Sequence, residues 1–133
     1  MADRLTPERD GRRIALNRDE SASAIDAGVM VMINEDGDAV AAFEQADRFV
    51  TGVAVKRAAA GDKVAECATG IFRFDNSATL PVNLLAVGGL CYVENDRTVK
   101  GSGATPAGLV FDVDDAGVWV EIGPRTGFFA DQV

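Results

Sequence analysis

Acidic side chains gather in two short turns, and their types and spacing raise the question of a metal site. Asp112, Asp114 and Asp115 lie in FDVDDAG, and Glu35, Asp36 and Asp38 lie in NEDGD. Calcium takes several oxygen ligands from one loop, but the spacing of these carboxylates matches no EF-hand. Asn, Asp and Gly are also the residues that tight turns require. The sequence therefore favours two acidic hairpin turns over a calcium site, and we predict no bound metal.

The two cysteines, Cys67 and Cys91, sit within apolar strand patterns, and the chain has no histidine. Without histidine, zinc sites of the common Cys/His kind are excluded, and a nucleophile lacks its usual base. A disulfide forms only if the two strands abut, so we interpret both thiols as small core side chains. No glycine-rich phosphate loop is present. We therefore expect no enzyme and no cofactor, although a carboxylate pair in a pocket is not visible from sequence.

The second part of the chain repeats the pattern of the first. Gly52 and Gly61 are nine residues apart in GVAVKRAAAGDKVAE, and Gly108 and Gly117 repeat that spacing in GLVFDVDDAGVWVEI. Upstream, residues 27–40 and 88–99 each hold an apolar run, an Asn/Asp turn and a closing valine. One pair of hairpins cannot bury its own apolar face, so two similar hairpin-pair units predict a compact all-β barrel or sandwich over residues 14–123.

Residues between these units carry weaker signals. Pro81 makes a long helix improbable in residues 76–89, which we expect to form a loop or one short helical turn. Residues 100–108, KGSGATPAG, read as a flexible surface connection. In the strand predicted at residues 109–113, alternation places Leu109, Phe111 and Val113 on one face.

Aromatic residues are few, and three of them are candidates for a subunit interface. Phe72 and Phe74 share the inward face of GIFRFD, which makes them the expected aromatic centre of the core. In VWVEI, the inward Val118, Val120 and Ile122 turn Trp119 to the opposite face. Trp119 either packs under a loop or meets a partner subunit, because Trp is enriched at interface centres. Phe128 and Phe129 pose the same question, since they lie in a predicted C-terminal tail, residues 124–133.

The chain of 133 residues has a net charge of −8, so its surface should repel phosphate backbones and anionic lipid headgroups. We therefore expect no nucleic-acid partner and no membrane association, and no apolar stretch reaches the ~20 residues of a membrane helix. Residues 1–13 are polar, with interleaved arginines and acids, and are predicted to form a flexible N-terminal arm. We expect the protein to be made in the cytoplasm.

The order of GVMVMINEDGDAV, FVTGVAV, AAAGDKVAECATGIFRF, GGLCYVE, GLVFDV and GVWVEIG resembles the capsid cement, or head-decoration, proteins of tailed phages. The resemblance covers roughly residues 14–123 and rests on turn and strand patterns. It implies a β-barrel-like body, often a homotrimer, on the outer surface of the virion capsid. It also implies that an N-terminal arm, here residues 2–16, orders on the major capsid protein. The implied contacts are Arg4, Leu5, Arg12, Arg13 and Ile14.

A different class of protein stays open as an alternative. A ligand- or carbohydrate-binding β-module of a phage tail or adhesion structure would share the all-β pattern. Such modules use convergent exposed aromatic residues, whereas Trp119 and Tyr92 lie at unrelated positions of this chain. The sequence therefore favours capsid decoration over ligand binding.

Overall fold

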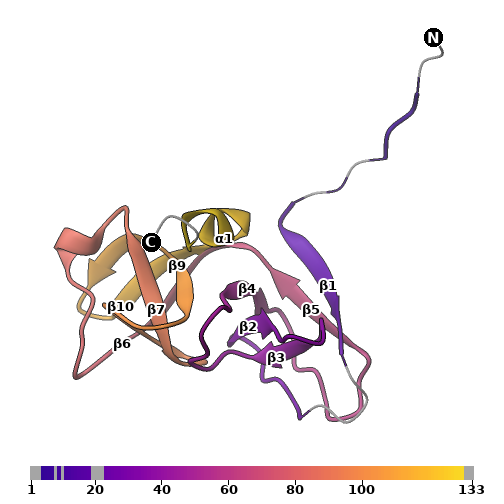
Figure 1. The fold of residues 1–133 in the computed structure, drawn as a ribbon, viewed down its shortest axis with the longest axis horizontal. Helices are drawn as coiled ribbons and strands as arrows, with labels where there is room; N and C mark the ends of the chain where they lie inside the picture. Colours follow the sequence, from indigo (N-terminus) through magenta and orange to yellow (C-terminus); the bar gives the residue numbers. More distant parts are fainter. Residues whose placement is uncertain (1–3, 8, 10, 19–22, 131–133) are drawn as a thin grey trace.

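The computed structural model of the chain describes residues 4–7, 9, 11–18 and 23–130. Within these residues, ten strands and two short helices form a body of two halves, from which the N-terminal segment extends (Figure 1). The prediction of an all-β domain is confirmed.

The first half, residues 13–69, is an open antiparallel sheet. Its strands are β1 (Arg13–Asn17), β2 (Met30–Ile33), β3 (Ala39–Ala41), β4 (Val50–Ala54) and β5 (Val64–Ala68). The order across the sheet is β1-β5-β4-β2-β3, so β1 and β3 form its two edges.

The second half, residues 70–130, has the same strand order closed into a barrel. Its strands are β6 (Gly70–Asn76), β7 (Leu90–Asn95), β8 (Thr98–Lys100), β9 (Pro106–Asp114) and β10 (Gly117–Ile122). The order β6-β10-β9-β7-β8 closes because β6 and β8 also pair, in parallel, at Asp75 with Thr98 and Asn76 with Val99. A 3₁₀ turn, η1 (Leu84–Ala86), precedes β7, and helix α1 (Pro124–Ala130) follows β10.

The two halves match in detail as well as in order. Val31 pairs with Gly52 in the first half and Cys91 pairs with Gly108 in the second, and a shift of register follows Val31 and Cys91 alike. A Cβ atom on Gly52 would lie 3.0 Å from the Cβ of Cys67. A Cβ on Gly108 would lie 2.4 Å from the carbonyl oxygen of Glu121. The glycines that revealed the repeat therefore allow neighbouring strands to approach closely.

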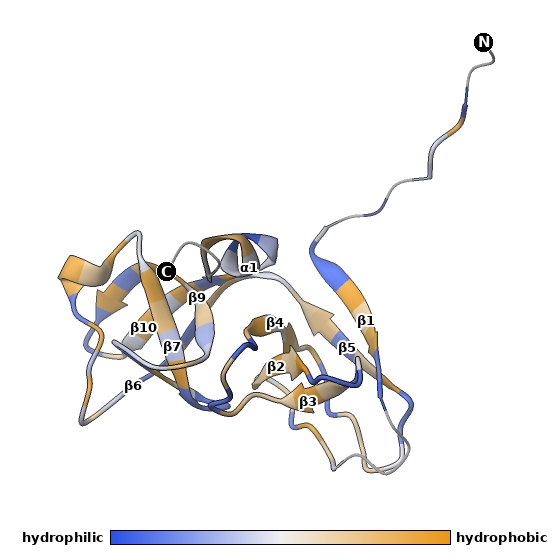
Figure 2. Cartoon of the chain, in the orientation of Figure 1, coloured by the Kyte–Doolittle hydropathy of each residue, from blue (hydrophilic) through white to orange (hydrophobic). Residues whose placement is uncertain are grey.

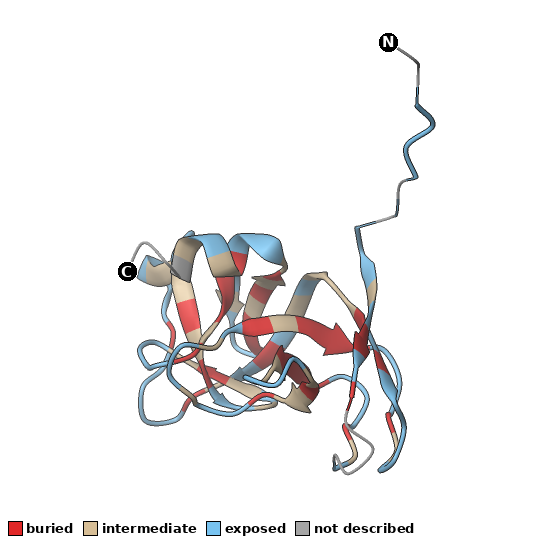
Figure 3. Ribbon diagram, turned by 45° about the vertical axis from the view of Figure 1, so that its right-hand side comes forward, coloured by how far each residue is buried: buried red, intermediate tan, exposed pale blue. Residues whose placement is uncertain are grey.

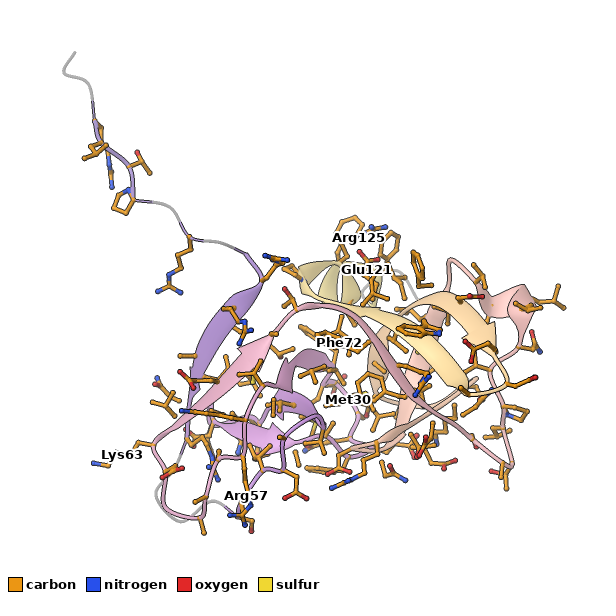
Figure 4. All side chains as sticks on the ribbon, turned by 180° about the vertical axis from the view of Figure 1, so that it is seen from behind. Met30, Arg57, Lys63, Phe72, Glu121 and Arg125 are labelled. Carbon is orange, nitrogen blue, oxygen red and sulfur yellow. The ribbon has the colours of Figure 1, made fainter. Side chains whose placement is uncertain are left out.

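Each half buries its own interior, and the halves share a further apolar layer. The predicted core cysteines, Cys67 and Cys91, are both buried and free, and Phe74 is buried with Phe72 packed beside it. Met30, on the outer face of β2, belongs to the core cluster of the second half and lies where the halves meet (Figure 4). Its backbone N–H donates to the carbonyl oxygen of Asp96 at 2.9 Å. The halves are thus joined by apolar packing and by a main-chain hydrogen bond.

The alternation predicted at residues 109–113 is wrong. Trp119 pairs with Asp112 and Val120 pairs with Val110, so Phe111 is an extra residue at a β-bulge. The bulge turns the Phe111 side chain outward, where it is 59% exposed.

Two connecting segments also differ from expectation. Thr105 lies within the predicted surface connection, yet it is fully buried and donates from Oγ1 to the carbonyl oxygen of Gln45 at 2.7 Å. The predicted C-terminal tail contains helix α1, which packs on β9, β7 and β4. Asn76 ends β6, and residues 77–89 form the expected loop with one helical turn, η1.

Candidate interaction surfaces

The described residues of the N-terminal segment are strongly exposed. Residues 4–7 have no regular secondary structure and extend away from the body (Figure 3). Leu5 is 96% exposed, and Arg4 is exposed beside it. We call residues 2–12 the arm. Leu5 is therefore available to a partner.

The arm joins the body at Thr69. The hydroxyl of Thr69 donates to the carbonyl oxygen of Gly11 at 2.8 Å, and its backbone N–H donates to the carbonyl oxygen of Arg12 at 2.9 Å. Arg13 and Ile14 then belong to β1, and Ile14 is half-buried against the first-half core. Ile14, expected as an arm contact, lies on β1 with its side chain half-buried, because alternate side chains of a paired strand turn inward. Arg4, Leu5 and Arg12 lie on the arm itself.

A groove of about 260 Å³ borders this junction. We call it the arm groove. Its lining comes from Arg9, Gly11, Arg13, Ile14, Phe49, Thr51, Thr69, Gly123 and Pro124. Phe49 is 39% exposed, and the charged residues among the described lining residues are Arg9 and Arg13. The groove therefore combines an apolar floor with positive charge.

An apolar ridge projects from the second half between β6 and β7. It consists of Leu80, Leu84, Leu85 and Val87 (Figure 2). Leu85 is 96% exposed and Leu84 is 66% exposed. Residues 78–89 carry no charged side chain. Exposed leucines at this density on a folded loop indicate an interaction surface.

The backbone of the ridge is held in place by side-chain hydrogen bonds. Asn76 donates from Nδ2 to the carbonyl oxygen of Val82 and accepts from the Val82 N–H, both at 2.8 Å. Val82 is itself buried. Asn83 accepts from the N–H of Leu85 at 3.0 Å and caps η1. The exposed leucines are therefore carried by an ordered loop, which lowers the entropy lost when a partner binds.

The three predicted interface aromatics lie on two elements, one on β10 and two on α1. Trp119, on β10, is half-buried, and its Nε1 donates to Asp114 Oδ2 at 2.9 Å while the Arg73 guanidinium lies 5.7 Å from its ring centroid. Its polar atom is thus satisfied within the chain. On α1, Phe128 is 64% exposed and meets Phe129 edge to face. Phe128 is the most available of the three to a partner.

The acidic turns stabilise themselves. The indole of Trp119 and the N–H of Ala116 both donate to Asp114, which lowers the pKa of that carboxyl below its usual value. Asn34 Oδ1 accepts the N–H groups of Asp36 and Asp38, each at 3.0 Å. Within the described part of the chain, no group of three or more His, Cys, Asp and Glu side chains is placed to hold a metal ion.

The thiols are unsuited to chemistry because burial favours their neutral form. Burial raises the pKa of Cys67 to about 11 and that of Cys91 to about 12. A thiolate is the reactive species of cysteine, so neither side chain is activated at neutral pH.

The three lysines lie in different surroundings. Lys56 is exposed and pairs with Glu66 at 2.8 Å, an interaction that raises the pKa of Lys56 and lowers that of Glu66. Lys63 also lies at the far end of the first half, near Arg57 (Figure 4). Lys100 differs, because its side chain is only 14% exposed and bridges to Glu44 at 2.8 Å. This ion pair connects the halves.

Comparison of the chain with models of known protein families, with curated proteins and with solved structures finds no match. Among the helices described, none has the length and apolar character needed to cross a membrane.

The ridge and the arm groove were not found by sequence reasoning. The uncharged, leucine-rich residues 78–89 do not fit the alternation of a strand, and this was the available signal for the ridge. The groove had no such signal, since its lining comes from four separate stretches of sequence.

Proposed function

We propose that this chain is a non-enzymatic capsid decoration protein, a cement protein that binds the outer surface of a phage head and bridges subunits of the major capsid protein. The observation that carries the proposal is the exposed arm, which leaves a compact β body and presents Arg4 and Leu5. A body with a free extended segment suits attachment by strand addition, in which main-chain hydrogen bonds offset the entropy lost on ordering.

The reach of the arm fits a bridging role. Residues 2–10 precede the attachment point at Gly11, and nine extended residues span at most about 30–32 Å. We propose that the arm uses this reach to contact a neighbouring capsid subunit. Many such contacts over the shell would add up to strong total attachment, even where each is weak.

Several properties of the body favour a structural role. The described cysteines are buried with raised pKa values, and the chain carries no histidine to serve as a base. The net charge of −8 disfavours contact with packaged DNA. A homotrimer on the outer surface of the virion is the assembly we propose, since a symmetric oligomer multiplies the number of arms.

The proposal is tested with expanded, undecorated heads of the phage that encodes the chain. Purified protein should co-sediment with the heads, saturate at a fixed ratio to major capsid protein, and raise the temperature at which the heads rupture. Failure of the full-length protein to bind would reject capsid decoration. A glycan screen would then test the ligand-binding alternative.

A further inference from the structure

The apolar ridge has no structural task within its own chain. Val82 anchors the loop in the core, and Asn76 and Asn83 hold its backbone, so Leu84 and Leu85 are not needed to keep the loop folded. Leu85 nevertheless projects into solvent with 96% of its surface exposed. An ordered loop that presents leucines in this way is a preformed binding element.

The arm groove is the described hollow whose chemistry complements the ridge. Ile14, Phe49 and Pro124 supply apolar surface, and the volume of about 260 Å³ leaves room for an aliphatic side chain. Groove and ridge lie far apart in the molecule, because the ridge is at the outer end of the second half whereas β1 belongs to the first half (Figure 1). A ridge can therefore enter only the groove of another copy.

Charge complementarity supports the same pairing. Glu94 lies at the base of the ridge, where it accepts from the hydroxyl of Ser77 at 2.6 Å, and that hydroxyl accepts the N–H of Leu80 at 3.0 Å. Arg9 and Arg13 line the groove. When apolar side chains enter the groove, Glu94 approaches a region of positive charge, and such complementarity favours one orientation of binding.

We propose that the apolar ridge of one copy binds the arm groove of the next copy. The two surfaces differ, so the contact is heterologous and repeats head to tail, either closing into a ring or continuing as a chain. A closed ring of three would place one arm at each junction. This self-association is independent of capsid binding and is measured in the absence of heads.

Two complementary variants test the contact. Leu85→Glu disables the ridge with no buried group disturbed, and Thr51→Trp fills the groove from β4. Each variant alone should associate at least about tenfold more weakly than the wild type in sedimentation velocity. Mixed together, they retain one intact ridge and one intact groove, so they should form a 1:1 complex that does not grow further.

Matched controls separate this contact from other surfaces. Val64→Glu places the same charge at a 45%-exposed apolar position on β5 and should leave association unchanged. Phe128→Glu tests the competing surface on α1 and should also leave it unchanged. The proposal is overturned by a wild type that is monomeric at every concentration, by an L85E variant that associates normally, or by a mixture that forms no 1:1 complex. Circular dichroism verifies that each variant is folded.

Discussion

The two halves of this protein use one strand order with two outcomes. Strands β1–β5 form an open sheet, whereas β6–β10 close into a barrel. Val31 is larger than its match, Cys91, but at five other matching interior positions the first half has the smaller side chain. These five pairs, first half before second, are Leu16 and Phe74, Ala39 and Val99, Ala54 and Val110, Ala65 and Val118, and Cys67 and Val120.

Closure depends on two residues at the end of one strand. β6 extends to Asn76, and its last residues, Asp75 and Asn76, make the parallel pairing with β8. β1 ends at Asn17, and the next residue, Arg18, is buried and donates from its guanidinium to the carbonyl oxygens of Ala59 and Ser23. The comparison shows that a repeated strand order does not by itself determine whether a barrel closes.

The largest effect is expected where the closed half is tightest. Gly108→Ala would place a Cβ 2.4 Å from the Glu121 carbonyl oxygen, whereas Gly52→Ala meets its nearest atom at 3.0 Å. We expect Gly108→Ala to lower the free energy of unfolding by about 3 kcal/mol or more, and Gly52→Ala by about 1 kcal/mol. Urea denaturation measures both, with Gly11→Ala as the control. Equal losses at Gly52 and Gly108 would contradict the difference in packing.

A smaller effect is expected at the strand end that closes the barrel. Asn76→Ala removes two hydrogen bonds to Val82 and leaves the buried main-chain groups of the loop without these partners. We expect a loss of about 1–3 kcal/mol. Hydrogen exchange should also become faster in residues 80–87, while β1–β5 remain unchanged. Unaltered exchange in the ridge would show that Asn76 does not hold it.

The open half should expose its thiol first. Cys67 lies in the open sheet and Cys91 in the closed barrel, so a thiol reagent should label Cys67 faster through local opening. Faster labelling of Cys91 would reverse the predicted order of local stability, and C67S and C91S identify the signals.

The thiols also give the protein a pH dependence. Their pKa values are raised by burial from 9.0 to about 11 and about 12, so the unfolded chain loses these protons first. Below pH 9 the two thiols should therefore not affect the free energy of unfolding. As the pH rises from 9 through the raised pKa values, the free energy of unfolding should fall. The fall should diminish in C91S, and an unchanged pH profile would contradict the assignment.

The smallest effect concerns the ion pair between the halves. The Lys100 ammonium and the Ala104 N–H lower the pKa of Glu44 from its usual 4.5. This stabilisation is present above that pH and is lost as the pH falls through the lowered pKa. Glu44→Gln should slightly lower the urea midpoint at neutral pH and match the wild type in acid, where Glu44 is protonated. A difference that persists in acid would assign the effect to packing.

Local patterns in the sequence predicted much of the fold. The paired glycines predicted the repeat, and the alternation in residues 70–75 and 118–122 identified the inward faces correctly. The bulge at Phe111 was not predictable, because one added residue reverses the facing of those that follow. Barrel closure depends on a non-local pairing of β6 with β8, and helix α1 is too short to be stable without its packing partners.

The arm is the element on which the proposed function depends, and the structure defines where it can be removed. Deleting residues 2–10 retains Gly11 and Arg12, which bind Thr69, so the body should unfold at the same urea concentration as the full chain. The most direct measurement is co-sedimentation of this variant and the full-length protein with expanded heads. We predict saturable binding of the full chain and loss of binding on deletion; equal binding of the two would contradict attachment through the arm.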